Sequence, residues 1–450
     1  MSRLPRSPLS LGLAAGCVAA IALPQDVPAR AKAPPHAAAA IADGERSPLA
    51  MGAMLARWDR MPASPERDRL ALAIDAAAGQ RHATVSRLFW YTDLAAARRA
   101  ASALDRPILS LRMLGRLDED LSCANSRFFR TTLYANAEVG KLLREGFVLH
   151  WSTERPVPRV TIDYGDGRKL ERTTTGNSAH YVLDAAGRVV DVLPGLYAPA
   201  VFRAELEKSA GLARRVRKLD HAAYARAVAG HHHVEAEAAE TRFASVVGTQ
   251  YLRGLRGFGG LGRLLGRDEV DASAVARAQR STITKMVVEV PELVELGEIK
   301  ASISRSDVEA WAVVGQKLWG IYTASTAAPA PNAPARRPIG APPAPPAPVV
   351  LDAPSRALVA QVHNAGPVKA TPAELAEVIA RLEQSIVADT ALNELRLRPQ
   401  IRGVLAAGEV LDFERLNAWI YAAVFETRKD DAWLGLLPRT DFTGLPGDGV

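Results

Sequence analysis

The chain has 450 residues, of which 48% are hydrophobic and 23% are charged, proportions ordinary for a folded soluble protein with two or three compact domains. The formal net charge is +7, from 56 basic and 49 acidic residues, and the acidic residues are interspersed with the basic ones. A nucleic-acid-binding protein would gather its positive charge on one element, so this distribution argues against nucleic acid as a partner.

The first 33 residues have the layout of a secretory signal peptide. Arg3 and Arg6 precede an apolar run from Leu9 to Leu23, and small residues suited to cleavage follow between Ala29 and Ala33. The run is shorter than the ~20 residues that a membrane-spanning helix needs. We therefore expect export to the periplasm or out of the cell.

Two other fates of the N-terminus stay open. Ala14-Ala15-Gly16 before Cys17 resembles a lipoprotein cleavage box, in which Cys17 would receive lipid. The segment could also stay as an uncleaved anchor, and only in these two cases would the protein meet a membrane. If the signal is removed with Cys17, Cys123 is left alone and cannot form an internal disulfide.

A helical lead segment is expected over residues 34–87. After an Ala/Pro-rich start, apolar residues recur at helical spacing in Ser47–Met61 and again in Pro65–Ala78. Pro62 and Gly79 mark the ends of these two predicted helices.

Residues 88–212 alternate between strand and helix patterns, which predicts an α/β domain. Gly165-Asp166-Gly167 between two β-patterned runs is a hairpin signal, so we expect a hairpin inserted into this domain. In chain order the expected elements are a strand at 88–91, a helix at 94–104, a strand at 108–113, a helix after Cys123, a helix at 137–144, a strand at 147–151, the hairpin at 160–173, strands at 181–184 and 189–193, and a helix at 199–209.

Three short motifs stand at ordered places in this region. Arg106-Pro107-Ile108-Leu109 opens a strand, Asn136-Ala137-Glu138-Val139 opens a helix, and Phe147-Val148 opens the next strand. With the segment Cys123–Ser126 before the first helix, this pattern resembles exported bacterial thioredoxin-like domains, including the reductase domain of periplasmic disulfide-interchange proteins. The resemblance implies a thioredoxin-like domain over about residues 88–210, with Cys123–Ser126 at the place of the family's Cys-x-x-Cys.

The chain departs from the family pattern at three places. Ser126 stands where the second, resolving cysteine is expected, and no tryptophan precedes the motif. The stretch Thr175–His180, which corresponds to the loop that carries a cis-proline in active members, has no proline. The chain is therefore a Cys-x-x-Ser variant.

Cys123 and Ser126 are the candidate catalytic residues. A thiol at a helix N-terminus is favoured as the thiolate, Ser126 could donate a hydrogen bond to it, and Arg127 and Arg130 add positive charge. Such a monothiol can form a mixed disulfide but cannot release the partner by internal attack, which suits isomerisation, reduction with an external thiol or redox sensing. The alternative is that Cys123 is a small buried apolar residue left from an ancestral pair.

The rest of the chain predicts helices around a linker. Residues 213–323 are mostly helical in pattern, 324–356 form an Ala/Pro-rich linker, and 357–450 form a small helical domain. In the last, Thr371 can cap a helix over Leu375–Val387. A second helical run, Phe413–Thr427, carries Trp419, Tyr421 and Phe425, which we expect to be core residues or a groove for a partner peptide.

Two further motifs are weak signals. The three side chains of His231–His233 point in different directions on a helix and cannot bind one ion together. Gly257–Gly262 has the G-x-G-x-x-G spelling without a clear strand before it or a long helix after it. We therefore expect no metal and no cofactor.

Two functions of different classes fit these observations. In the first, the domain exchanges or senses disulfides on exported proteins, or with thiol reductants, through Cys123. In the second, it is a redox-inactive binding or scaffold protein of the cell envelope. Exposure of Cys123 at a helix start favours the first function, and burial of its sulfur among apolar side chains favours the second.

Overall fold

The structure is a computed structural model of the whole chain, and it describes residues 46–173, 177–247, 350–365, 369–408, 412–425 and 427. The predicted signal peptide with Cys17, the Gly257–Gly262 motif, and most of the central region and linker lie outside these residues. None of the described helices is long and apolar enough to cross a membrane.

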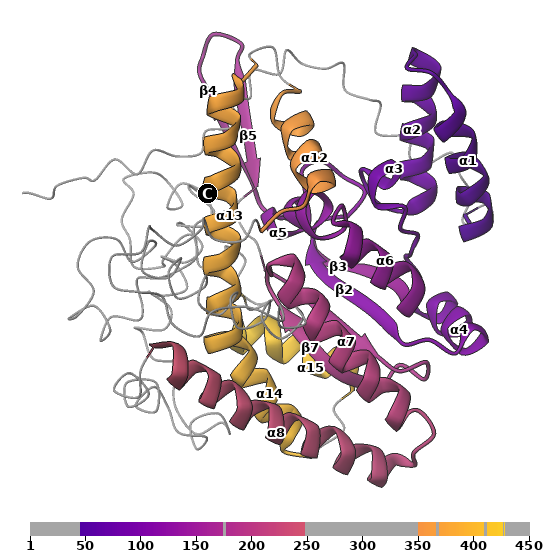
Figure 1. Ribbon diagram of the computed structural model, residues 1–450, viewed down its shortest axis with the longest axis vertical. Coiled ribbons are helices and arrows are strands. Elements are labelled where there is room, and N and C mark those ends of the chain that lie inside the picture. The colour runs from indigo at the N-terminus through magenta and orange to yellow at the C-terminus, as the bar shows by residue number, and fades with distance from the viewer. Residues whose placement is uncertain are drawn as a thin grey trace, which may run out of the picture.

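A five-stranded mixed sheet lies at the centre (Figure 1). Its strand order is β1-β3-β2-β6-β7. Strands β1, β3 and β2 pair in parallel, β6 pairs antiparallel with β2, and β7 pairs antiparallel with β6. The strands are β1 (Trp90–Tyr91), β2 (Ile108–Leu114), β3 (Val148–Arg155), β6 (Ser178–Leu183) and β7 (Val189–Pro194). Every residue of β2, β6 and β7 is buried, which identifies strands that are covered on both faces.

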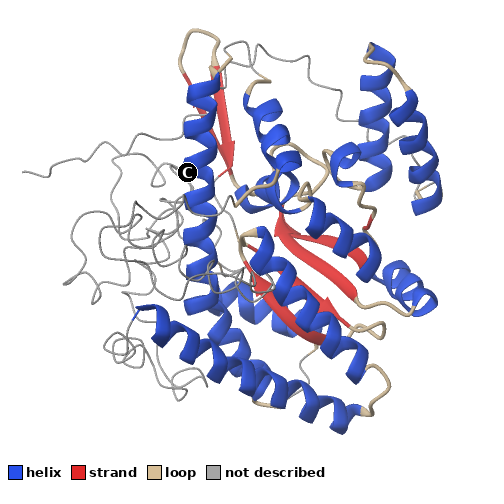
Figure 2. Ribbon diagram, in the orientation of Figure 1, coloured by secondary structure: helices blue, strands red, loops and turns tan. Residues whose placement is uncertain are grey.

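Helices lie on both sides of this sheet (Figure 2). They are α1 (Pro48–Arg60), α2 (Pro65–Ala78), α3 (Ala83–Ser86), α4 (Leu94–Leu104), α5 (Ala124–Phe128), η2 (Phe129–Leu133), α6 (Ala137–Gly146), α7 (Pro199–Val216), α8 (His221–Val247), α12 (Ala353–His363), α13 (Pro372–Leu392), η4 (Asn393–Leu397), α14 (Arg398–Ala406), α15 (Phe413–Trp419) and η5 (Ile420–Val424), where η marks π-helical segments. The cap chosen from the sequence for α13 is confirmed, because Thr371 forms a capping box with Glu374; in the same way Asp93 caps α4.

The order of strands and helices between residues 88 and 212 is the predicted one, so a mixed α/β fold is confirmed for this region. The predicted hairpin is also present. Strands β4 (Arg159–Asp163) and β5 (Lys169–Thr173) pair antiparallel as a separate two-stranded sheet, and Ile162 and Tyr164 are exposed on it.

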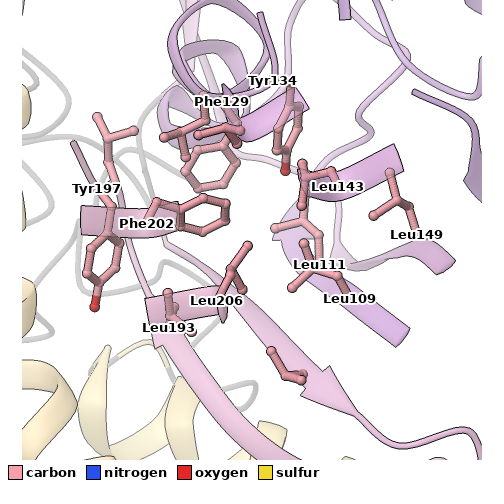
Figure 3. Close-up of a cluster of buried hydrophobic side chains, with 14 of the residues drawn as sticks. Leu109, Leu111, Phe129, Tyr134, Leu143, Leu149, Leu193, Tyr197, Phe202 and Leu206 are labelled. Atoms are coloured by element: carbon pink, nitrogen blue, oxygen red, sulfur yellow. The ribbon is translucent and has the colours of Figure 1, made fainter. Parts of the chain in front are cut away.

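The first face of the sheet packs against α5, η2, α6 and α7. Leu109 and Leu111 of β2 point into this layer, where Phe129 and Phe202 meet them from the helices (Figure 3). The same cluster continues into the C-terminal part of the chain through Leu351, Val359, Ile379, Leu382, Ile386 and Tyr421.

The second face is covered by α4 together with the C-terminal helices α14, α15 and η5. Alternate strand residues such as Ile108 and Tyr181 turn to this side, where they share a cluster with Ile401, Phe413 and Ile420. The described C-terminal helices therefore complete the cover of the sheet. The domain limits derived from the sequence stay predictions.

Candidate functional site

Cys123 lies at the start of the helical segment that follows β2. It is the N-cap residue of α5, and its backbone N–H donates to the carbonyl of Leu114, the last residue of β2, at 3.2 Å. The thiol is free, and the residue is 0% exposed. It belongs to the apolar cluster of the first sheet face, with Phe129 and Tyr134 among its members.

Ser126 lies one turn further on and is fully buried as well. Its hydroxyl oxygen is 2.8 Å from the carbonyl oxygen of Cys123 and 2.5 Å from the hydroxyl oxygen of Ser122. Within the described part of the chain it makes no hydrogen bond to the Cys123 sulfur. The hydrogen bond from Ser126 to the Cys123 sulfur that the sequence suggested is therefore not made in this geometry.

Arg130 supplies the positive charge next to the thiol. Its guanidinium is buried and donates to the carbonyls of Leu117 (3.1 Å) and Glu119 (2.6 Å) and to the hydroxyl of Ser122 (3.1 Å). Burial lowers the pKa of Arg130 to about 10, and the nearby acidic groups, Asp120 first and Cys123 among them, act in the opposite direction. Arg130 therefore stays charged at neutral pH.

The side chain of Arg127, the other arginine noted near Cys123 in the sequence, reaches the β4–β5 hairpin. It donates to the hydroxyl of Thr173 at the end of the β4–β5 hairpin, at 3.2 Å. The two arginines predicted to act together on the thiol therefore have different partners.

The first residue of β6, Ser178, meets the start of α5. Asn125 Nδ2 donates to the hydroxyl of Ser178 at 3.1 Å, and the carbonyl of Ser178 accepts the N–H of Gly195 at 2.8 Å. Ser178, in the stretch that the resemblance equates with the cis-proline loop, therefore contacts the Cys123–Ser126 segment through Asn125. No cis peptide bond occurs among the described residues.

The C-terminal end of the described chain covers this region. The hydroxyl of Tyr421 donates to the carbonyl of Asn177 at 3.4 Å, and Asn177 Nδ2 donates to the hydroxyl of Thr427 at 3.4 Å. Arg155 donates to the carbonyl of Thr427 at 3.3 Å. Tyr421 shares the apolar cluster of Cys123, and the pKa of Tyr421 is raised well above its usual value by burial first and then by Tyr181 and Cys123.

A buried pair that the sequence did not reveal lies behind the cysteine. The hydroxyl of Tyr134 and Nε2 of His180 are 2.7 Å apart, and the His180 ring also packs on Phe129 and Phe202. Burial lowers the pKa of His180 to about 3, so this ring is neutral at neutral pH. A histidine inside the apolar strand Ser178–Leu183 was the only sequence signal for it.

A second buried polar cluster, which we name the clasp, holds the C-terminal helices against β7, α7 and α8. Arg398 donates to Asp191 (2.8 Å), Glu205 (2.7 Å) and Glu394 (2.8 Å), and Arg402 donates to Glu205 (3.2 Å). The four ion-paired side chains of Arg398, Arg402, Asp191 and Glu205 are each exposed by 2% or less. Four charges so deeply buried are tolerable only when paired in this way.

Of the three adjacent histidines on α8, His231 and His232 pack edge-on with their ring centroids 5.2 Å apart, whereas His232 and His233 have different polar neighbours. His232 Nε2 lies 2.8 Å from the carbonyl oxygen of Val190, and exposed His233 lies 3.4 Å from Glu237. Within the described ranges no group of three or more histidine, cysteine, aspartate or glutamate side chains is arranged to hold a metal ion.

Comparison with known proteins adds no relative. No family model, no curated protein and no solved structure matches this chain.

Proposed function

We propose that the chain is an exported protein whose thioredoxin-like domain is redox-inactive at rest and serves as a binding scaffold of the cell envelope. The thioredoxin-like identity is supported by the β-α-β-α-β-β-β-α order that remains when the inserted β4–β5 hairpin is left out, and by a cysteine at the start of the helix after the second strand. Export is supported by the N-terminal sequence pattern alone.

The complete burial of Cys123 carries the redox-inactive part of the proposal. A thiol must approach a partner disulfide in line with its S–S bond, and a sulfur with no exposed surface offers no such path. The absence of a second cysteine at Ser126 points the same way, because a mixed disulfide formed at Cys123 would not be resolved internally.

A monothiol exchange function is the second candidate. It is favoured by one observation, the position of Cys123 at a helix start close to the buried, charged Arg130.

Incubation of the native chain with oxidised glutathione separates the two candidates. In exchange, the Cys123 thiolate attacks one glutathione sulfur, forms a mixed disulfide and releases the other glutathione as a thiolate. We expect no adduct at Cys123 by peptide mass spectrometry in native buffer and a full adduct in denaturant. Rapid modification of the native protein, absent in Cys123→Ser, would support the exchange function and contradict our proposal.

A further inference from the structure

We infer that residues 421–425 and 427, which we name the flap, form a cover over Cys123 that opens while the other C-terminal helices stay docked, so that the thiol is latent. This inference rests on the proposed function in one respect, namely that the Cys123 thiol does not react while the flap is closed. It adds a conformational step that would make the cysteine available.

The flap closes the site mainly through Tyr421. This side chain is 1% exposed and lies in the same apolar cluster as Cys123, and its ring packs edge-on against Phe425 with the centroids 5.3 Å apart. Its hydroxyl reaches the carbonyl of Asn177, the residue next to Ser178, which contacts the start of α5. The flap thus spans the side of the site that faces the β6 loop.

The hydrogen bonds that hold the flap to the rim are long. The three bonds from Tyr421 to Asn177, from Asn177 to Thr427 and from Arg155 to Thr427 measure 3.4, 3.4 and 3.3 Å, beyond the usual range for strong protein hydrogen bonds. Residues 421–424 of the flap belong to the π-helical segment η5, and the N–H of Phe425 bonds to the carbonyl of Ile420.

The rest of the C-terminal region is anchored far more strongly. In the clasp, Arg398 makes three buried ion pairs of 2.7–2.8 Å with carboxylates. Charge-assisted bonds of this length are roughly twice as strong as neutral ones. Opening of the flap would expose Tyr421 and Val424 but leave the clasp intact, so the open form is a minor state that needs no global unfolding.

The test is the alkylation rate of Cys123 by iodoacetamide in the folded full chain, followed on the Cys123 peptide so that Cys17 does not interfere. Rates are measured over a series of low urea concentrations. Labelling through the flap should depend only weakly on urea, whereas labelling through global unfolding should follow the full urea dependence of stability. A urea dependence equal to that of global unfolding at every concentration would overturn the inference.

Substitutions in the flap test whether the flap is the segment that opens. Tyr421→Ala and Thr427→Ala should each raise the rate at zero urea by about tenfold or more, because each removes a contact made only by the closed flap. Tyr224→Ala is the matched control, since Tyr224 is an equally buried tyrosine whose hydroxyl bonds to the carbonyl of Val189 away from the flap. Equal rates in flap and control variants of equal global stability would contradict the inference.

The outcomes also separate the inference from the proposed function. If wild-type Cys123 is labelled as fast as an unfolded peptide, the redox-inactive resting state is wrong. If wild type and all variants are equally protected, the resting state stands and the flap is wrong. Should Tyr421→Ala fail to fold, Thr427→Ala and the urea series of the wild type still decide the question.

Discussion

The environment of Cys123 is assembled from residues that lie far apart in the sequence. Its helix start comes from the turn after β2, its neighbouring charge from Arg130, and its cover from Tyr421. The position of Cys123 at a helix start was predictable from the sequence, because the residue follows a strand pattern and precedes a helical pattern. The burial was not, because the apolar cluster that contains Cys123 also includes Tyr421, almost 300 residues later in the chain.

Ser126 is a structural residue in this arrangement, and its substitution should show it. Ser126→Ala removes a buried hydroxyl that bonds to the carbonyl of Cys123 and to Ser122, so we expect a loss of about 1–3 kcal/mol in unfolding free energy. Ser102→Ala, on the exposed side of α4, should change stability by no more than ~0.5 kcal/mol. Urea unfolding of both variants makes the comparison, and equal effects would contradict the buried role.

His180 should remain neutral well into the acid range. Burial lowers its folded pKa to about 3, below the ~6.5 of an unfolded histidine, so the unfolded state takes up the proton first as the pH falls. This histidine contributes its full stability above about pH 6.5 and loses it as the pH falls towards 3. In NMR its ring proton should not titrate between pH 7.5 and 5, and a midpoint near 6.5 would contradict the buried position.

Two other buried groups affect stability in the same pH window. The pKa of His150 is lowered to about 4 by burial, which acts in the same direction as His180. The pKa of Asp75 is raised to about 6 by burial. The folded state therefore binds this proton before the unfolded state does, and the protein gains stability as the pH falls through 6. The NMR signal of His180 is therefore a better test than overall stability.

At the scale of elements, the clasp decides how the C-terminal helices dock. Burial alone would raise the pKa of Asp191, but Arg398 outweighs it and holds that pKa below the usual range of a carboxyl. The stabilisation from Asp191 is therefore present above about pH 4 and is lost as the pH falls below that value.

Arg398→Met should be strongly destabilising. It leaves the carboxylates of Asp191 and Glu205 buried without their main partner, for which we expect a loss of about 3–5 kcal/mol. Arg203→Ala, which breaks the solvent-exposed pair with Glu207 on α7, should cost less than ~1 kcal/mol. Denaturant midpoints measure both changes, and a small loss in Arg398→Met would mean that the clasp is not formed.

Gly195 provides a second test of how the C-terminal helices dock, because it lies against Asn393 of η4. It has a φ of +73°, and a Cβ there would lie 2.6 Å from the side-chain amide of Asn393 in η4. Gly165 in the hairpin turn has a similar φ of +76° but open space around it, so it is the matched control for backbone strain alone. We expect Gly195→Ala to cost at least ~1 kcal/mol more than Gly165→Ala in urea unfolding, and equal costs would contradict the contact with η4.

The strands and helices between residues 88 and 212 were predictable because each is set by local spacing, caps and turns. The segment Val189–Pro194 reads as a strand from its apolar residues, and Asp166 with its flanking glycines reads as a turn. Which elements pack together was not predictable, because the hydrophobic pattern of a strand or helix shows which face is buried but not which element covers that face. Asp191 within an apolar strand and the i,i+4 pair Arg398 and Arg402 are the signals from which the clasp could have been suspected.

At the scale of the described molecule, the C-terminal helices complete the cover of the sheet. On the second face, Tyr181 and Val192 share one buried cluster with residues of α4 and of the C-terminal helices α14, α15 and η5. Helices α8 and α14, far apart in the sequence, lie side by side at the lower edge of Figure 1. The sequence predicted a separate helical unit because the Ala/Pro-rich run before it has the composition of a linker.

Cleavage of that linker is the most direct test of the central claim, that the C-terminal helices are a docked cover of the α/β sheet and of Cys123. A specific protease site placed between Ala335 and Ala344 would cut the chain without touching any described residue. We predict that the two fragments co-elute in size-exclusion chromatography and that Cys123 stays protected from iodoacetamide. Separate elution of the C-terminal fragment, with a freely reactive Cys123 in the remaining part, would contradict the account.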